Sequence, residues 1–238
     1  MKGSKYDIYN LNQLLLPVFE KRFNFSKLRK EKILKKININ ERIIEIPFVL
    51  QNLHMAGKGD LKILDLGCME SSLPIMLASM GYKVYGVDIR KYPYFHPNLN
   101  FLTADARKLP FKANTFDIAI AISVIEHLGL GAYGDIVCQD ADSVALEKIY
   151  DCLKDKGLLF LTAPFGVKSV NKEQRVYDLD LIKRLFDRRF TIKKIIFSAI
   201  NESHKGNPVW EIVSLEDAEK IVSRNMTNAV ALCISQKL

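Results

Sequence analysis

From residue 62 to the end of the chain, short runs rich in apolar and β-branched residues alternate with amphipathic runs of helical length. This alternation predicts strands joined by helices, because parallel strands need crossover connections that cover the faces of one sheet. Strands are expected at 62–66, 83–87, 100–103, 116–123, 157–163, 190–198 and 229–235. Helices are expected at 72–80, 142–153 and 178–186. The sequence therefore predicts an α/β fold with a mostly parallel sheet, and such sheets bind ligands at the carboxyl ends of their strands.

Composition is consistent with one substantial folded domain carrying a short appendage. The chain has 238 residues, of which 48% are hydrophobic and 26% charged. Its longest apolar runs, 118–125 and 158–165, are too short to span a bilayer, and no secretory cleavage site is evident near the start. The four cysteines form no CxxC pair: Cys68, Cys138, Cys152 and Cys233. We therefore expect a reduced, cytoplasmic protein without structural zinc.

The strongest charge asymmetry lies near the start of the chain. Residues 21–36 contain eight basic residues and one acidic residue, so they carry +7 of the formal net charge of +8. We interpret residues 1–58 as a basic helical N-terminal extension, followed by the α/β domain at 59–238 with an insertion at 199–226. The basic segment is either a solvated lysine-rich helix face or a surface for an anionic or membrane-surface partner.

Three acidic residues fall at or just beyond the ends of the first three predicted strands: Asp65, Asp88 and Asp105. A carboxylate in the position of Asp88 can accept hydrogen bonds from both hydroxyls of a ribose. Asp105 is placed to accept a hydrogen bond from an adenine amino group. A single aspartate at a strand end is common, because Asp favours turns. Three of them after a glycine turn at Gly67 indicate a ligand that contains a nucleoside.

Residues 61–165 resemble the class I, Rossmann-like methyltransferases that depend on S-adenosylmethionine (SAM). The resemblance rests on the segments "ILDLGC", "GYKVYGVDIR", "NFLTADARKLPFKANTFDIAIAISVIEHLGLG" and "LKDKGLLFLTAPFG". It implies a three-layer fold with a mostly parallel, seven-stranded sheet whose last strand is antiparallel. It also implies methyl transfer from SAM. The resemblance does not extend to residues 1–58 or clearly to 199–226.

The first motif departs from the family pattern, which is Asp/Glu-x-Gly-x-Gly-x-Gly. Here the segment reads "DLGCMES", and only Gly67 survives. In dinucleotide sites the later glycines allow the backbone to approach a pyrophosphate. SAM has no phosphate and needs only the turn and free backbone N–H groups facing its carboxylate. The missing glycines therefore argue against NAD as the ligand and remain compatible with SAM. The alternative is a loop that no longer binds a cofactor.

The resemblance implies SAM as the cofactor and assigns its contacts to residues at the strand ends. These are Asp65, Gly67, Cys68, Asp88, Ile89, Asp105, Ala106 and Ser123. Within this set, Asp65 and Gly67 would shape the methionyl end, Asp88 would hold the ribose, and Ser123 would lie under the sulfur. No metal is expected, because no two histidines have the spacing of metal ligands.

The segment "SVIEHLGLGAYGD" after the fourth predicted strand brings polar side chains to that strand's carboxyl end. Methyl transfer from a sulfonium needs mainly alignment, because the leaving group is already activated. A hydroxyl acceptor also benefits from a general base, and His127 is the candidate because imidazole titrates near neutral pH. The alternative is that His127 packs beside the strand end. For Glu126 three roles are open: it orients His127, it binds the acceptor, or it is merely exposed.

Three further residues are candidates for contact with the acceptor: Tyr133, Arg175 and Trp210. Tyr133 follows the glycine-rich turn, and Arg175 would suit an anionic acceptor. Trp210 is the only tryptophan and lies in the range 199–226, where insertions in this fold commonly cover the acceptor side. Trp210 is equally compatible with a structural role, packed onto the end of the sheet.

The turn "IEHLGLGAYGD" resembles a subset of the family that modifies sugars and surface polysaccharides, which implies O-methylation of a sugar, glycan or other small-molecule hydroxyl. An RNA or protein methyltransferase is the first alternative, because the basic segment could follow phosphates. No RNA-binding module or Asn/Asp-Pro-Pro-Tyr motif supports it, so nucleic acid is the less favoured partner. The second alternative is a non-catalytic SAM-binding partner subunit. We expect a cytoplasmic protein, peripheral at the membrane if the basic segment binds lipid.

Overall fold

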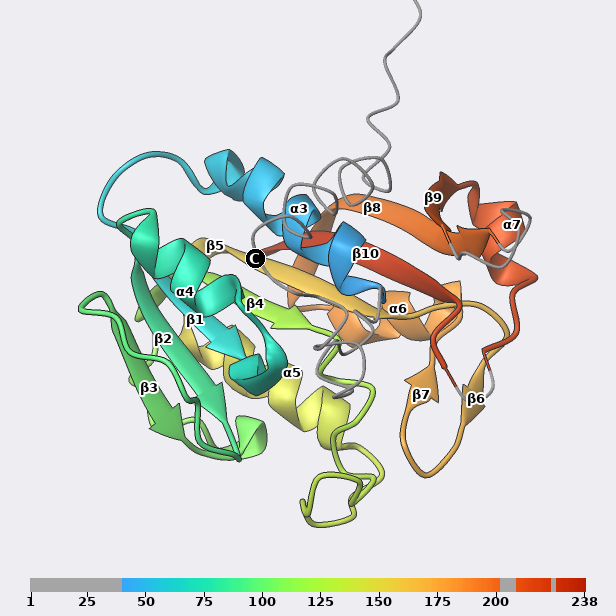
Figure 1. The fold of residues 1–238 in the computed structure, drawn as a ribbon, viewed down its shortest axis with the longest axis horizontal. Coiled ribbons are helices and arrows are strands. Elements are labelled where there is room, and N and C mark those ends of the chain that lie inside the picture. Colours follow the sequence, from blue (N-terminus) through green and yellow to red (C-terminus); the bar gives the residue numbers. More distant parts are fainter. Residues whose placement is uncertain (1–39, 202–208, 224–225) are drawn as a thin grey trace, which may run out of the picture. The chain divides into compact units, whose positions relative to one another are not determined.

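The computed structural model describes residues 40–201, 209–223 and 226–238. Their main feature is one eight-stranded sheet with the order β3-β2-β1-β4-β5-β10-β8-β9, and a separate two-stranded hairpin is formed by β6 and β7 (Figure 1). The strands are β1 Lys62–Leu66, β2 Lys83–Asp88, β3 Leu99–Thr103, β4 Phe116–Ile122, β5 Leu153–Pro164, β6 Ser169–Val170, β7 Arg175–Val176, β8 Phe190–Asn201, β9 Val209–Val213 and β10 Ala229–Lys237.

Strands β1 to β5 are parallel, and β10 is antiparallel to both of its neighbours, β5 and β8. The predicted α/β fold with a mostly parallel sheet and an antiparallel last strand is therefore confirmed. The count of seven strands was one too few, because β9 adds to the edge at β8. The apolar run of β9, "VWEIV", lies in the range 199–226 that was interpreted as an insertion, so it was not predicted as a strand.

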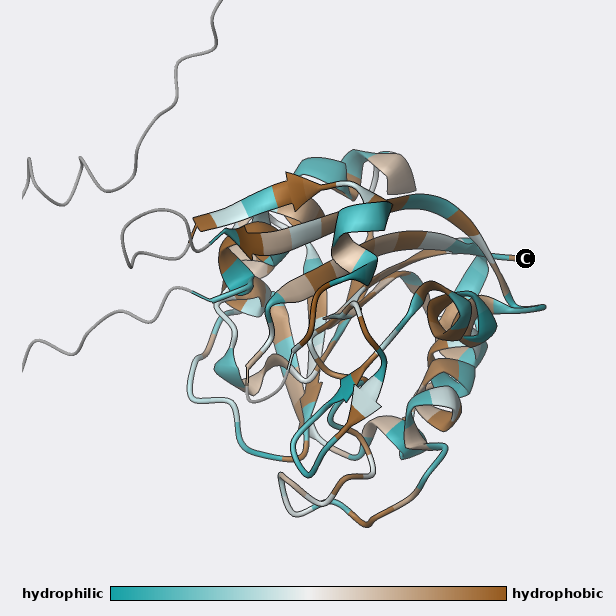
Figure 2. Ribbon diagram, turned by 90° about the vertical axis from the view of Figure 1, so that its right-hand side faces the viewer, coloured by the Kyte–Doolittle hydropathy of each residue, from teal (hydrophilic) through white to brown (hydrophobic). Residues whose placement is uncertain are grey.

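Helices cover both faces of the sheet in a three-layer arrangement. Their bounds are α3 Arg42–Asn52, α4 Leu73–Ser79, α5 Ala141–Cys152, α6 Leu179–Phe186 and α7 Leu215–Glu219, with 3₁₀ turns η1 Leu53–Ala56, η2 Cys68–Glu70 and η3 Ala106–Lys108. One apolar cluster joins α3 and α4 to the sheet, and another joins α5 and α6 to the opposite face. Figure 2 shows hydrophobic residues concentrated in the central strands.

Helix α3 belongs to this fold and not to a separate extension. Val49 and Leu53 are buried in the cluster shared with the sheet, and the Phe48 ring meets Phe160 of β5 edge to face at 6.3 Å. The compact unit therefore begins at Asn40. The boundary we expected at residue 59 was wrong, because the polar linker at 57–60 separates two parts of one core. The predicted basic segment, 21–36, lies outside the described residues.

In the part of the chain that the structure describes, no helix combines the length and the apolar character needed to cross a bilayer.

Candidate cofactor and acceptor site

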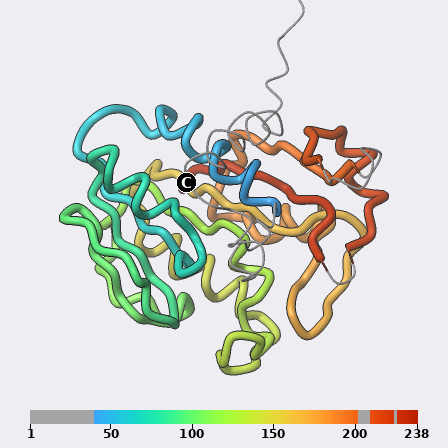
Figure 3. Tube along the Cα trace, viewed as in Figure 1, coloured from blue at the N-terminus to red at the C-terminus, as the bar shows by residue number. Residues whose placement is uncertain are grey.

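A cavity of about 210 Å³ opens at the carboxyl ends of the parallel strands. Its walls come from segments far apart in the sequence. They are residues 40–42 at the start of α3, Gly67 and Glu70 after β1, residues 87–90 at the end of β2, residues 104–106 after β3, and six residues between 123 and 135 after β4. Figure 3 shows the chain after β4, in yellow-green, projecting from this edge of the sheet beside the β6–β7 hairpin.

Gly67 is the position in the first loop where glycine is required. Its φ is +63°, and a Cβ there would lie 2.3 Å from Cγ2 of Val124. The following residues form the 3₁₀ turn η2, where the N–H of Met69 donates to Asp88 at 3.0 Å. This loop therefore forms its turn with a single glycine, because the positions after Gly67 have conformations that other residues adopt.

Asp65 and Cys68 lie beneath the first loop and do not line the cavity. Burial raises the pKa of Asp65 to about 7, and its Oδ2 has no hydrogen-bond partner among the described residues. The Cys68 thiol is buried beside Gly86, and burial raises its pKa well above the ordinary range. The structure therefore does not place either side chain in the cavity, although both were predicted to contact the cofactor.

Asp88 and Ile89 line the cavity at the end of β2, as predicted. The Asp88 carboxylate accepts hydrogen bonds from the N–H of Met69 and from the N–H of Arg90, at 3.0 and 2.9 Å. The Arg90 side chain also contacts Asp88, pairs with Glu70 at 2.6 Å and lies 4.8 Å from the centre of the Tyr133 ring. Each carboxylate oxygen can accept further hydrogen bonds, so Asp88 retains acceptor capacity toward the cavity.

Asp105 and Ala106 line the cavity after β3, also as predicted. Asp105 begins the turn η3 by accepting a hydrogen bond from the N–H of Arg107, and the Arg107 guanidinium pairs with its carboxylate at 2.6 Å. These hydrogen bonds hold the pKa of Asp105 below its ordinary value. Arg107 also donates to the carbonyl of Ile136 at 2.8 Å. The base of the cavity is thereby tied to the segment that follows β4.

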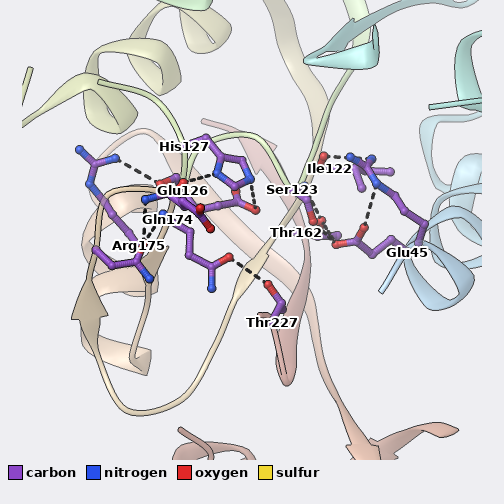
Figure 4. Close-up of polar contacts among 12 residues, drawn as sticks. Glu45, Ile122, Ser123, Glu126, His127, Thr162, Gln174, Arg175 and Thr227 are labelled. Carbon is purple, nitrogen blue, oxygen red and sulfur yellow. Dashed lines mark hydrogen bonds and ion pairs between the residues drawn. The ribbon is translucent and has the colours of Figure 1, made fainter. Parts of the chain in front are cut away.

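His127 lines the cavity with its imidazole held in one tautomer. Its Nδ1 lies 2.5 Å from the carbonyl oxygen of Glu173, which can only accept, so Nδ1 carries the proton. Nε2 keeps a lone pair and lies 3.7 Å from Oε1 of Glu126 (Figure 4). Burial lowers the pKa of His127 below 6.5, so the ring is neutral at pH 7. The ring of Tyr133 meets it edge to face at 5.2 Å.

Glu126 does not line the cavity. Its side chain is buried, its Oε2 has no hydrogen-bond partner among the described residues, and burial raises its pKa well above the ordinary value. Glu126 can therefore act on the reaction only through His127. Across the described ranges, no group of three or more His, Cys, Asp and Glu side chains is placed to hold a metal ion.

Comparison with known proteins agrees with this geometry. A methyltransferase-domain family model matches residues 64–161. A SAM-dependent methyltransferase from Methanosarcina mazei has a similar structure, with a TM-score of 0.54, 18% identity, and coverage of 78% of this chain and 96% of its own. The Burkholderia thailandensis 1,6-didemethyltoxoflavin-N1-methyltransferase, solved with S-adenosylhomocysteine, gives a TM-score of 0.55, 13% identity, and coverage of 100% and 93%. The chain therefore has the fold of SAM-dependent methyltransferases, and residues 64–161 match a methyltransferase-domain model.

These matches agree with the predicted family and with SAM as its cofactor. A curated relative, the mitochondrial ubiquinone biosynthesis O-methyltransferase of Bos taurus, is 27% identical over 208 residues. The alignment covers 76% of this chain and 47% of that relative. The chain thus spans about half the length of the curated relative that it matches.

Two predicted acceptor contacts lie elsewhere in this chain. The Arg175 guanidinium donates to the carbonyls of Leu128 and Gln139 at 2.6 and 3.2 Å, and it does not line the cavity. It therefore holds the segment after β4 in place. Trp210 is buried on β9 in the apolar cluster that contains α3, away from the cavity. Of the three predicted acceptor contacts, only Tyr133 lines the cavity.

Several cavity residues were not predicted from the sequence. The main ones are Glu41, Arg42, Glu70, Arg90 and Leu128. Arg90 carried a usable signal, because an arginine two residues after a strand-end aspartate can pair with it. Arg42 carried a weaker one, since it is followed three residues later by Glu45, which an α-helix places on the same face.

Proposed function

We propose that this chain transfers the methyl group of SAM to a hydroxyl oxygen of a small molecule. The observation that carries the proposal is the neutral His127 imidazole on the cavity wall, with Nδ1 fixed by a carbonyl and Nε2 left as a base. The curated relative is an O-methyltransferase, which supports oxygen as the methylated atom.

The residues that line the cavity have the chemistry that SAM needs. Asp88 would accept hydrogen bonds from the ribose hydroxyls, and Ile89, Asp105 and Ala106 would border the adenine. Arg42 donates to the carbonyl of Ile122 at 3.2 Å and has further N–H groups on the same cavity wall. It is therefore the cation that would pair with the methionyl carboxylate.

SAM supplies a methyl group on a positively charged sulfur, which leaves as a neutral thioether when the acceptor oxygen takes the methyl. His127 would accept the hydroxyl proton at Nε2 as the new carbon–oxygen bond forms. Glu126, 3.7 Å from Nε2, would favour the resulting imidazolium in its ionised form, which burial disfavours until the positive charge develops beside it. Tyr133 and Arg90 would close the wall beside the acceptor.

A sugar hydroxyl is the acceptor we propose first, because the turn after β4 resembles the sugar-modifying subset of the family. An anionic or membrane-surface partner for residues 21–36, and a cytoplasmic or peripheral membrane location, stay predictions.

Calorimetric titration with SAM, S-adenosylhomocysteine and NAD tests the cofactor site first. Micromolar binding of SAM and S-adenosylhomocysteine with no binding of NAD is expected. Transfer of a labelled methyl group to nucleotide-sugars, free sugars, phenols, RNA and protein then tests the acceptor. Label appearing only in RNA or protein would overturn the proposal. Binding of SAM with no transfer to any acceptor would favour a non-catalytic partner subunit.

A further inference from the structure

Glu45 is a buried carboxyl in helix α3, outside the residues that the family model matches. Its Oε1 accepts two hydrogen bonds, from Oγ of Ser123 at 2.7 Å and from Oγ1 of Thr162 at 2.6 Å (Figure 4). The N–H of Ser123 in turn donates to Oγ1 of Thr162 at 3.0 Å. The three residues therefore form a closed ring of hydrogen bonds at the carboxyl ends of β4 and β5.

The ring holds the backbone where the cavity wall begins. Ser123 lines the cavity and has a φ of +48°, a left-handed conformation that is costly for a residue with a side chain. Such a conformation persists when surrounding contacts enforce it. The next residue, Val124, is the one that a side chain at position 67 would strike, and His127 follows three residues later. The direction in which the chain leaves β4 therefore sets both walls of the cavity.

Stability alone does not explain a carboxyl at this place. Glu45 is fully buried, and its Oε2 has no hydrogen-bond partner among the described residues, with Nε of Arg42 3.9 Å away. A buried carboxyl that is partly satisfied is costly, and an apolar side chain of similar size would pack there without that cost.

We propose that Glu45 is a positioning residue of the cofactor cavity, which holds Ser123 in place through paired hydrogen bonds and so makes α3 part of the site. This inference rests on the proposed SAM site.

The variants Glu45→Leu and Glu45→Gln separate positioning from folding. At pH 6 a Gln amide resembles the protonated carboxyl and can still accept from both hydroxyls, so SAM affinity should stay within about threefold of wild type. Glu45→Leu removes both hydrogen bonds and should weaken SAM at least about tenfold. Asn52→Leu is the matched control, because Asn52 is a buried polar residue of the same helix, bonded to Phe48 and Lys194. It should lower the melting temperature without changing SAM affinity.

The readouts are SAM affinity by calorimetry and melting temperature for each variant. Glu45→Leu should also have little further effect when combined with Ser123→Ala, because both remove the same contact. The inference is overturned if Glu45→Leu binds SAM like wild type, or if Asn52→Leu weakens SAM equally. Wild-type protein that fails to bind SAM would overturn the proposed function and this inference together, whereas methyl transfer to no tested acceptor would leave the binding measurements decisive.

Discussion

The two halves of the cavity are built by different kinds of contact. In the cofactor half, Asp88 and Asp105 are each bonded by the arginine two residues later. In the wall that follows β4, Ser123 is held by Glu45, 78 residues away, and Leu128 is held by Arg175, 47 residues away. The first half is therefore formed locally at strand ends, whereas this second half exists only once distant segments have come together. Damage to a distant contact should then affect what this wall touches, which is SAM at Ser123 and the acceptor beyond it, while leaving Asp88 and Asp105 in place.

The largest effect is expected from His127→Ala. Loss of a general base lowers kcat by about 10²–10⁴-fold, while SAM affinity should stay within about threefold because the strand-end residues are untouched. Single-turnover kinetics and calorimetry measure the two quantities. His54→Ala is the matched control, since His54 is exposed in η1 and away from the cavity. Equal loss of SAM affinity and kcat would instead make His127 a cofactor contact.

The pH dependence of wild-type activity also tests whether His127 acts as a neutral general base. Burial lowers the pKa of His127 below 6.5, and the base works only when neutral. Activity should therefore be full at neutral pH and fall as pH drops below 6.5. A fall that began above pH 7 would contradict a neutral, buried base.

The second prediction concerns the stability cost of Glu45. Burial raises its pKa from 4.5 to about 7, so the folded state prefers the protonated carboxyl. Stability from this group is present below pH 4.5 and is lost as pH rises toward and past 7, by on the order of 3 kcal/mol. Glu45→Gln cannot ionise, so its stability relative to wild type should increase between pH 4.5 and 8. Urea unfolding across this range measures the difference, and a constant difference would contradict the assigned pKa.

The third prediction tests the cofactor half. Asp88→Ala removes the acceptor for the ribose hydroxyls and should weaken SAM and S-adenosylhomocysteine by at least about tenfold, since hydrogen bonds to a charged group contribute about 1.5–3 kcal/mol. Calorimetry measures both affinities. Asp60→Ala is the control, because Asp60 is exposed and its ion pair with Lys83 lies at the surface. Unchanged binding by Asp88→Ala would remove the ribose site from this strand end.

The contrast between the two halves of the cavity also explains which site residues could be predicted from the sequence. Gly67, Asp88, Asp105 and Ser123 were predicted because each adjoins the end of a strand, and the order of strands follows from the alternating pattern. Glu45 was not predicted, because its partners lie 78 and 117 residues away and no periodicity reports such pairing. Trp210 was misplaced for a different reason. The range 199–226 was interpreted as an insertion, so the pairing of β9 with β8, which buries Trp210, was not predicted.

The smallest effect is expected from Arg175→Ala. The guanidinium fixes the segment after β4 through backbone carbonyls, so its loss loosens the wall that carries His127 and Tyr133 without removing a group from the cavity. The Michaelis constant for the acceptor should rise several-fold, about threefold to tenfold, with SAM affinity unchanged. Lys172→Ala is the control, because Lys172 is exposed in the same hairpin. Arg175→Lys should behave like the alanine variant, since a single ammonium cannot reproduce the planar set of donors that reaches both Leu128 and Gln139. A loss of SAM affinity in Arg175→Ala would show that the two halves of the cavity are coupled, and that the local contacts at the strand ends depend on the distant ones.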